Sequence, residues 1–219
     1  MSDTRWQVLV ADDHAIIRDA FRKILADSPD FELAGEASNG HEALARVRER
    51  AWDLVVLDMS MPGGRSGLEL VKLMRAEQPR LRILVFSMHP EEQYAVRAIR
   101  AGASGYLSKE SDGDLLLPAM RKVASGGAYV SANVAELLAT DTTPGGTELP
   151  HTRLSDREYG VFNRIVRGAS LTEIAEELSL SIKTVSTHKS HILAKLSLGN
   201  QVDLVRYAID HGLLDTARE

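Results

Sequence analysis

The sequence predicts an α/β domain with a doubly wound, parallel, five-stranded sheet, followed by an all-α domain of four helices. Over the first 125 residues, short apolar runs alternate with amphipathic helical segments, as is typical of parallel strands joined by helices. From about residue 150 onward the periodicity is helical throughout. A chain of 219 residues is long enough for two such domains, which we place at 1–125 and 151–219.

Five strand–helix units account for the first domain. Ser28-Pro29 ends the first helix, and Ser38-Asn39-Gly40 turns the chain into the second. The connections between the parallel strands are expected to be right-handed. The predicted strands are about 6–11, 31–37, 54–58, 83–87 and 103–107, and the predicted helices are about 14–26, 41–50, 68–77, 91–101 and 112–125.

Residues 126–150 are predicted to form a linker that contains a short helix. Gly126-Gly127 ends the alternating pattern, and a helical segment follows at about 132–139. The next stretch, about 140–147, is rich in Thr, Gly and Pro and lacks large apolar side chains, which indicates a flexible connection.

The second domain carries the pattern of a helix-turn-helix. Capping boxes from Ser155 to Glu158 and from Ser170 to Glu173 begin the first two helices, and Ser181 is the expected N-cap of the third. Two short helices joined by a tight turn, the second of them basic, are typical of this DNA-binding motif. The predicted helices are about 156–167, 171–178, 182–196 and 201–211.

The net charge of −5 is unevenly distributed. Residues 150–219 hold nine Lys and Arg and nine Asp and Glu, so the acidic excess lies in the first 149 residues. The segment 178–202 has no Asp or Glu but has three lysines, Lys183, Lys189 and Lys195. A basic helix on a neutral background favours contact with the phosphates of double-stranded DNA.

The composition argues against several classes of protein. The chain has no cysteine, which rules out disulfides and cysteine-based zinc sites. The first residues lack the apolar stretch of a signal peptide, and no apolar run approaches the roughly 20 residues that cross a bilayer. We therefore expect a cytoplasmic protein that does not contact a membrane.

Five polar side chains stand at or just after the ends of predicted strands: Asp12, Asp13, Asp58, Ser87 and Lys109. Because the carboxyl ends of parallel strands lie along one edge of a sheet, we expect these side chains to converge on one crevice. Three carboxylates suit a divalent cation such as Mg²⁺, and the ammonium and hydroxyl suit a phosphoryl group. The Asp58 carboxylate would be the nucleophile and its product an acyl phosphate.

Each of these residues also has a plainer interpretation. An aspartate at a strand end is often the N-cap of the next helix, and a single lysine is usually solvated. Such interpretations must account separately for five suitable side chains at successive strand ends, so a shared site is favoured.

Motifs along both domains resemble a known family. In the first domain, the segments Asp12-Asp13-His14, Asp58-Met-Ser-Met-Pro62, Ser87-Met-His-Pro and Gly102-Ala-Ser-Gly-Tyr106-Leu-Ser-Lys109 resemble a response-regulator receiver domain. In the second, Leu154-Ser-Asp-Arg-Glu158, Glu173-Ile-Ala175 and Ser181-Ile-Lys-Thr-Val185-Ser-Thr-His188 resemble the LuxR-type helix-turn-helix. Together they resemble the NarL/FixJ family of two-component transcription factors, over nearly the whole chain except about 140–150.

The resemblance implies a flavodoxin-like receiver that a partner sensor histidine kinase phosphorylates on Asp58. It makes Ser87 and Tyr106 a switch pair. On phosphorylation, Ser87 would move toward the phosphate, which Lys109 also contacts, and Tyr106 would rotate inward. The Mg²⁺ ligands that it implies are Asp12, Asp13, Asp58 and the backbone carbonyl of Ser60.

The implied function is DNA-binding transcription regulation rather than enzymatic catalysis. Its partners would be double-stranded DNA, a second copy of the chain and, as a further candidate, RNA polymerase. The residues expected to face DNA are Lys183, Ser186, Thr187, Lys189 and Ser190. The residues expected to form a dimer seam are Val202, Val205, Ala208 and Ile209, with burial inside the same domain as the alternative.

The sequence departs from the usual family pattern at two places. The loop between Pro62 and Gly67 is one residue longer, which bears on access to the metal site or kinase docking. Ser186 stands where many members have a lysine, which puts a DNA contact at that position in question.

Two other functions compete with this interpretation. An aspartate-nucleophile phosphatase or phosphotransferase would typically carry a second acid two residues after the nucleophile, where this chain has Ser60. A constitutive DNA-binding protein with a docking receiver would not need the complete set of five polar side chains. Formation of an acyl phosphate on Asp58 separates this last alternative from a phosphorylation switch.

Overall fold

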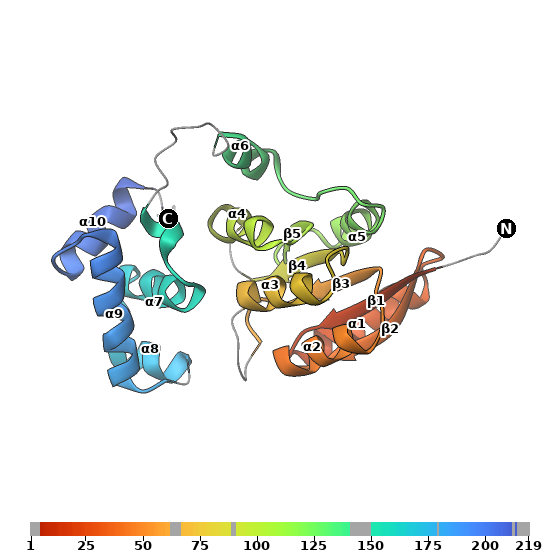
Figure 1. The fold of residues 1–219 in the computed structure, drawn as a ribbon, viewed down its shortest axis with the longest axis horizontal. Helices are drawn as coiled ribbons and strands as arrows, with labels where there is room; N and C mark the ends of the chain where they lie inside the picture. The colour runs from red at the N-terminus through yellow and green to blue at the C-terminus, as the bar shows by residue number, and fades with distance from the viewer. Residues whose placement is uncertain are drawn as a thin grey trace. The chain divides into compact units, whose positions relative to one another are not determined.

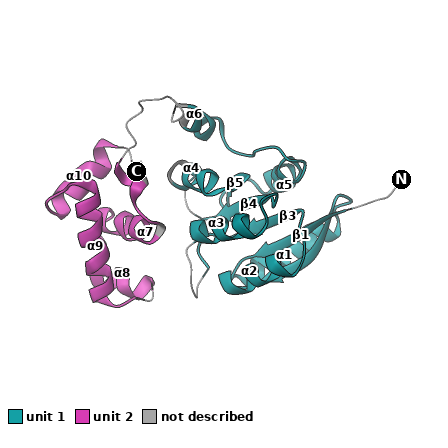
Figure 2. Cartoon of the chain, in the orientation of Figure 1, with its two compact units in different colours: residues 1–144 teal, residues 145–219 magenta. Residues whose placement is uncertain are grey.

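The computed structural model describes residues 5–61, 67–88, 91–140, 150–178, 180–211 and 213. The chain divides into two compact units, residues 1–144 and 145–219 (Figure 2).

The first unit is built on a parallel sheet of five strands (Figure 1). Its order is β2-β1-β3-β4-β5, so the chain first moves outward from β1 to one side and then crosses to the other. This reversal places a topological switch point between β1 and β3, and the predicted doubly wound fold is confirmed. The strands are β1 Trp6–Ala11, β2 Phe31–Ala37, β3 Leu54–Leu57, β4 Ile83–Ser87 and β5 Gly105–Ser108.

Five α-helices connect or follow these strands. The segment expected as one helix from 112 to 125 begins with a 3₁₀ turn, which the Asp112 carboxylate caps by accepting from the Asp114 N–H. The loop that was expected to be longer than usual falls at residues 62–66, outside the described residues. The helices are α1 Ala15–Ala26, α2 Gly40–Glu49, α3 Gly67–Glu77, α4 Glu91–Ala101 and α5 Leu116–Ala124, with the 3₁₀ turn η1 at Gly113–Leu115.

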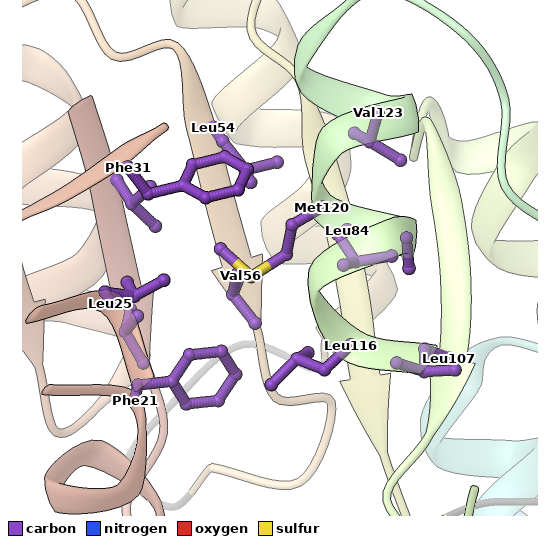
Figure 3. Packing of buried hydrophobic residues seen from close by; sticks show 13 residues of the cluster. Phe21, Leu25, Phe31, Leu54, Val56, Leu84, Leu107, Leu116, Met120 and Val123 are labelled. Carbon is purple, nitrogen blue, oxygen red and sulfur yellow. The ribbon is translucent and has the colours of Figure 1, made fainter. Parts of the chain in front are cut away.

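The main apolar cluster lies between one face of the sheet and helices α1 and α5 (Figure 3). Alternate strand residues such as Val8 and Val10 point to this face, whereas Leu9 belongs to the opposite one. Phe21 of α1 and Met120 of α5 are at most 1% exposed and reach the cluster from the two helices. Because both faces of every inner strand are covered, the strands read as continuous apolar runs and not as alternating ones.

The chain after α5 adds a short parallel bridge beside β5. The Tyr106 N–H donates to the Tyr129 carbonyl at 2.8 Å, and the Tyr129 N–H donates to the Ser104 carbonyl at 3.1 Å. A Cβ at Gly105 would lie 2.9 Å from the Tyr129 oxygen, so this close approach requires glycine. The first part of the segment predicted as a linker is therefore attached to the sheet.

Helix α6, Ala132–Thr140, continues this attachment by packing on α4. The Ser131 N–H donates to a carboxylate oxygen of Glu91 at 2.8 Å, and Val134 is fully buried. We call residues 128–140 the strap. The domain boundaries predicted at 125 and 150 stay a prediction, but the strap contacts the first unit.

The second unit contains four α-helices among its described residues, after a 3₁₀ turn. Both predicted capping boxes are formed, with the Ser155 and Ser170 side chains accepting from the Glu158 and Glu173 N–H groups. Ser181 caps the third helix by accepting from the Thr184 N–H. The elements are η2 Pro150–Arg153, α7 Asp156–Val166, α8 Leu171–Glu177, α9 Ile182–Leu196 and α10 Gln201–Asp210.

The helices of the second unit enclose their own small core. Tyr159 and Phe162 of α7 stack with ring centroids 5.8 Å apart, and Val185 and Ile192 of α9 are fully buried. This core fixes which side of α9 faces outward. None of the described helices in either unit is long and apolar enough to cross a membrane.

Candidate functional site

Strand register brings the predicted site residues of the first unit together. Ala11 pairs with Leu57, so Asp12 and Asp58 leave neighbouring strands at the same level. The Asp58 N–H donates to the Ala11 carbonyl at 2.8 Å, which fixes this junction. On the other side, the Lys109 N–H donates to the Ser87 carbonyl at 2.8 Å. The expected convergence at the carboxyl edge of the sheet is present in the structure.

Lys109 bridges two buried carboxylates. Its Nζ lies 2.6 Å from Asp12 Oδ2 and 3.0 Å from Asp58 Oδ2. The three side chains are 6%, 3% and 2% exposed, so the contacts are shielded from water. One ammonium thus holds residues from three strand ends in a fixed arrangement.

The pKa values of Asp58 and Lys109 are both raised, but for different reasons. Burial raises the pKa of the Asp58 carboxyl, the neighbouring Asp12 adds to this, and Lys109 only partly offsets it. Burial alone would lower the pKa of Lys109, but its bond to Asp12 and the nearby Asp58 outweigh that effect and raise it. Lys109 is therefore held in its charged form, whereas the negative charge on Asp58 is incompletely compensated.

The charge balance and the donor set fit a divalent cation. Asp12, Asp13 and Asp58 with Lys109 leave a net charge of −2 when all are ionised. Asp13 Oδ1 is buried and accepts no hydrogen bond from the described residues. Its contact with His14 Nδ1 at 2.8 Å lacks hydrogen-bond geometry. An orphaned carboxylate oxygen beside two others is what a hard cation would satisfy.

The backbone of Ser60 also contributes to the site at the carboxyl edge of the sheet. Its N–H donates to Asp58 Oδ1 at 3.1 Å, so that Asp58 is held on both oxygens. The predicted role of the Ser60 carbonyl as a cation ligand stays a prediction.

Ser87 and Tyr106 form a buried pair next to the site. Ser87 is fully buried and Tyr106 is 1% exposed, and their side chains are hydrogen-bond partners. Burial raises the pKa of the Tyr106 hydroxyl, so the phenol stays neutral. Tyr106 is thus buried beside Ser87, and the movements of the pair on phosphorylation stay a prediction.

We expect Asp58→Asn to raise the free energy of unfolding by about 1 kcal/mol at neutral pH without divalent cations. Asparagine keeps the shape and an acceptor for the Ser60 N–H, removes a poorly compensated buried charge and leaves Lys109 paired with Asp12. Thermal unfolding should show a Tm higher by a few degrees.

The pH dependence of this gain has a definite sign. Because the folded pKa of Asp58 is raised, wild-type stability increases as the pH falls through that pKa, and the advantage of the variant should shrink. Asp27→Asn, at an exposed carboxylate, is the matched control and should change the Tm little. A lower Tm for Asp58→Asn would contradict the charge argument.

The predicted DNA-contacting residues lie on one helix, α9. Lys183, Ser186, Thr187 and Ser190 are exposed, opposite the buried Val185 face. The Thr187 and Ser190 hydroxyls donate to carbonyls one turn earlier, at 3.0 and 3.1 Å. Their oxygens can still accept hydrogen bonds from base edges.

The lysines of α9 differ in their surroundings. Lys189 Nζ donates to the Gln201 side chain at 2.8 Å and Lys195 Nζ to Glu158 at 2.6 Å, whereas Lys183 extends from the exposed face. Burial lowers the pKa of His188, which favours a neutral packing role. Electrostatic attraction to DNA from one copy of this helix is therefore modest.

The predicted dimer seam on α10 is only partly available. Val202 and Ile209 are 68% and 60% exposed, and Val205 is half-buried on the same side. Ala208 is fully buried one turn after the buried Leu204, so the prediction that it lies in an intermolecular seam is wrong. The i, i+4 spacing puts Ala208 on the face that closes the core of its own domain.

Two residues were missed as parts of these sites. His14 follows the aspartate pair directly, and its ring lies within 3.2 Å of both carboxylates. Glu158 was assigned only to a capping box, although its carboxylate also reaches α9. Adjacency to Asp13 was a usable signal for His14, but nothing in the spacing predicts the pairing of Glu158 with Lys195.

Comparison with known proteins matches both units. Residues 8–121 match the response regulator receiver domain, and residues 152–208 match the bacterial regulatory proteins of the luxR family. The oxygen regulatory protein NreC of Staphylococcus haemolyticus is 36% identical over 215 residues, covering 95% of this chain and 99% of NreC. The response regulator UvrY of Escherichia coli is 37% identical over 207 residues, covering 94% of each chain.

Solved structures give the same result. RcsB of Salmonella enterica serovar Typhimurium, bound to the rprA promoter in the presence of the phosphomimetic BeF3⁻, has a TM-score of 0.62 and 26% identity. The match covers 93% of this chain and 98% of RcsB. The chain therefore belongs to the NarL/FixJ family of two-component response regulators, with a receiver domain followed by a LuxR-type DNA-binding domain.

Proposed function

We propose that a sensor histidine kinase phosphorylates this response regulator on Asp58 and that the modification controls binding of α9 to double-stranded DNA. The observation that carries the proposal is the buried Asp58 carboxylate, joined to Asp12 through Lys109 at the carboxyl edge of the sheet. A carboxylate whose charge is only partly compensated is suited to attack an electrophile rather than to stay inert.

The chemical step is a phosphoryl transfer. An Asp58 carboxylate oxygen forms a bond to phosphorus while the bond from phosphorus to the donor's imidazole nitrogen breaks. The electron pair of the broken bond stays with the imidazole, which takes up a proton. Lys109 compensates negative charge on the incoming phosphoryl oxygens, and burial strengthens that interaction.

Mg²⁺ would be held by Asp12, Asp13, Asp58 and the Ser60 carbonyl, where it would reduce the repulsion between the phosphoryl group and the three carboxylates. The orphaned oxygen of Asp13 supports this assignment. The carboxylates are already positioned by strand ends and by Lys109, so cation binding requires little rearrangement of the backbone.

The switch pair offers a route from Asp58 toward the second domain. Ser87 and Tyr106 are hydrogen-bonded, and the Tyr106 N–H is bonded to Tyr129 of the strap. The strap is also held by the bond from Ser131 to Glu91 at the start of α4. A change at Ser87 on phosphorylation would thus act on two attachments of the segment that leads to the DNA-binding domain.

Binding of DNA by a homodimer fits the modest charge of α9. One helix carries few free cations, so two half-sites would be needed for specific affinity. Solved structures of the RcsB relative include two dimers bound to two parallel DNAs. Val202, Val205 and Ile209 are the proposed contact residues between copies, and a contact with RNA polymerase stays an untested prediction.

The test is DNA selection from a random pool, followed by affinity measurement with and without a small phosphodonor and Mg²⁺. We expect the donor to tighten wild-type binding about tenfold and to leave Asp58→Ala unchanged. Asp53→Ala, at an exposed aspartate of the same unit, is the matched control and should respond like wild type.

The outcomes separate the competing functions. Equal binding by all variants with and without donor would make the receiver a docking module. Catalytic release of phosphate from many donor molecules, without an effect on DNA, would favour the aspartate-nucleophile enzyme.

A further inference from the structure

The His14 ring lies against the carboxylates proposed to hold Mg²⁺. Its Nδ1 is 3.2 Å from Asp12 Oδ1 and 2.8 Å from Asp13 Oδ1. One donor atom from each of Asp12, Asp13, His14 and Asp58 lies within 4.8 Å of all the others. One of these four donor atoms is a nitrogen, so the set differs from a site built of oxygen ligands alone.

Lys109 and His14 share one carboxylate, Asp12, and contact different oxygens of it. The ammonium uses Asp12 Oδ2 and Asp58 Oδ2, whereas the imidazole faces the Oδ1 atoms of Asp12 and Asp13. Since Asp13 Oδ1 is buried and accepts no hydrogen bond from the described residues, it retains its capacity for a cation. A cation beside Asp12 and Asp13 would therefore lie next to His14 Nδ1 and not next to the Lys109 ammonium.

The backbone at His14 presents the ring to this place. His14 is the N-cap of α1 with an extended conformation, and its side chain makes no capping bond to the helix. Its N–H donates to Asp12 Oδ1 at 2.9 Å, which holds the residue close to the carboxylate. The side chain is 61% exposed, so that a solvated cation can reach it.

The spacing agrees with two neighbouring ligands of one ion. Adjacent ligands of an octahedral ion with bonds of about 2.1 Å are about 3 Å apart. The separations from Nδ1 to the two carboxylate oxygens, 2.8 and 3.2 Å, lie on either side of that value. Imidazole is a ligand that divalent transition metals accept more readily than Mg²⁺ does.

We propose that His14 Nδ1 is a ligand in this site and that it selects first-row transition metals such as Mn²⁺ or Co²⁺ over Mg²⁺. The proposal rests on the proposed cation site at Asp58. It states which metal ion the site prefers. Measuring metal binding without phosphodonor or DNA therefore tests it separately from the phosphorylation switch.

The test compares the full-length chain with His14→Ala, His14→Asn and the control His41→Ala, an exposed histidine on α2. Dissociation constants for Mg²⁺ and Co²⁺ are measured by calorimetry at about pH 8 for every variant. We expect both His14 variants to bind Co²⁺ at least about tenfold more weakly and to change Mg²⁺ affinity less than about threefold. His41→Ala should change neither.

A spectroscopic signature identifies the ligand directly. Pulsed electron paramagnetic resonance of the Mn²⁺-loaded protein should show coupling to ¹⁴N in wild type and His41→Ala and lose it in both His14 variants. Asparagine keeps a polar N-cap, so loss of the signal in a folded His14→Asn cannot be ascribed to unfolding. Coupling that persists without His14, or equal weakening for both metals, overturns the proposal. Tighter Mg²⁺ binding in the variants also overturns it, because the ring would then only occupy the place of the cation.

Discussion

Replacing Lys109 with methionine should slow phosphorylation of Asp58 by a small phosphodonor at least about 100-fold at saturating Mg²⁺. Methionine is similar in length and apolar, so the change removes the charge with little loss of packing. The ammonium that lies 3.0 Å from Asp58 is no longer present to compensate the phosphoryl oxygens. Intact-protein mass spectrometry of the phosphorylated fraction over time measures the rate.

The same substitution changes the resting site. Asp12 and Asp58 lose their common partner while both stay buried, and the pKa of Asp58 should rise further. A divalent cation should then raise the Tm of Lys109→Met more than that of wild type, since it is the remaining source of positive charge.

Two controls sharpen this prediction. Lys122→Met removes an exposed lysine of α5 and should leave both the phosphorylation rate and the cation effect unchanged. Circular dichroism of Lys109→Met shows whether a lost rate comes from an unfolded receiver. A folded variant that is phosphorylated at the wild-type rate would exclude the charge role of Lys109.

The site at the sheet edge could be predicted because strand ends are visible in the sequence. Apolar runs buried on both faces mark the strands, and the residues that follow them must meet at one edge once the order of the sheet is doubly wound. Asp12, Asp58 and Lys109 needed no further information, since their positions follow from the backbone register.

Contacts that depend on packing between distant segments were not predictable in the same way. The strap follows Gly126-Gly127 and was predicted as part of a linker, whereas its bond from Ser131 to Glu91 joins residues 40 positions apart. Ala208 was assigned to a seam because an apolar residue at helical spacing looks the same on an internal and an external face. The position of the His14 ring depends on a local turn, which the residue types alone do not define.

Lys195→Met should destabilise the second domain by about 2 kcal/mol. This is less than the roughly 3–5 kcal/mol of a broken buried ion pair, because Lys195 is itself 42% exposed. Its ammonium lies 2.6 Å from Glu158, whose side chain is 6% exposed. Burial alone would raise the pKa of Glu158, but the bonds from Lys195 and from the Ser155 N–H outweigh it and lower that pKa. Without Lys195 the carboxylate would stay buried with the Ser155 N–H as its main support.

The pH dependence and the DNA affinity distinguish this role from a direct DNA contact. The pKa of Glu158 is lower in the folded state than in the unfolded state. The ionised carboxylate therefore stabilises the domain fully above the unfolded pKa, and this stabilisation is lost as the pH falls through the folded pKa. The free energies of unfolding of wild type and Lys195→Met should thus converge in acid. Lys183→Met, on the exposed face of the same helix, should leave the Tm unchanged and weaken DNA binding. Urea unfolding and DNA titration of both variants measure the two effects. If Lys195→Met weakened DNA binding with an unchanged unfolding midpoint, Lys195 would be a phosphate contact, and its pair with Glu158 would not be what stabilises the domain.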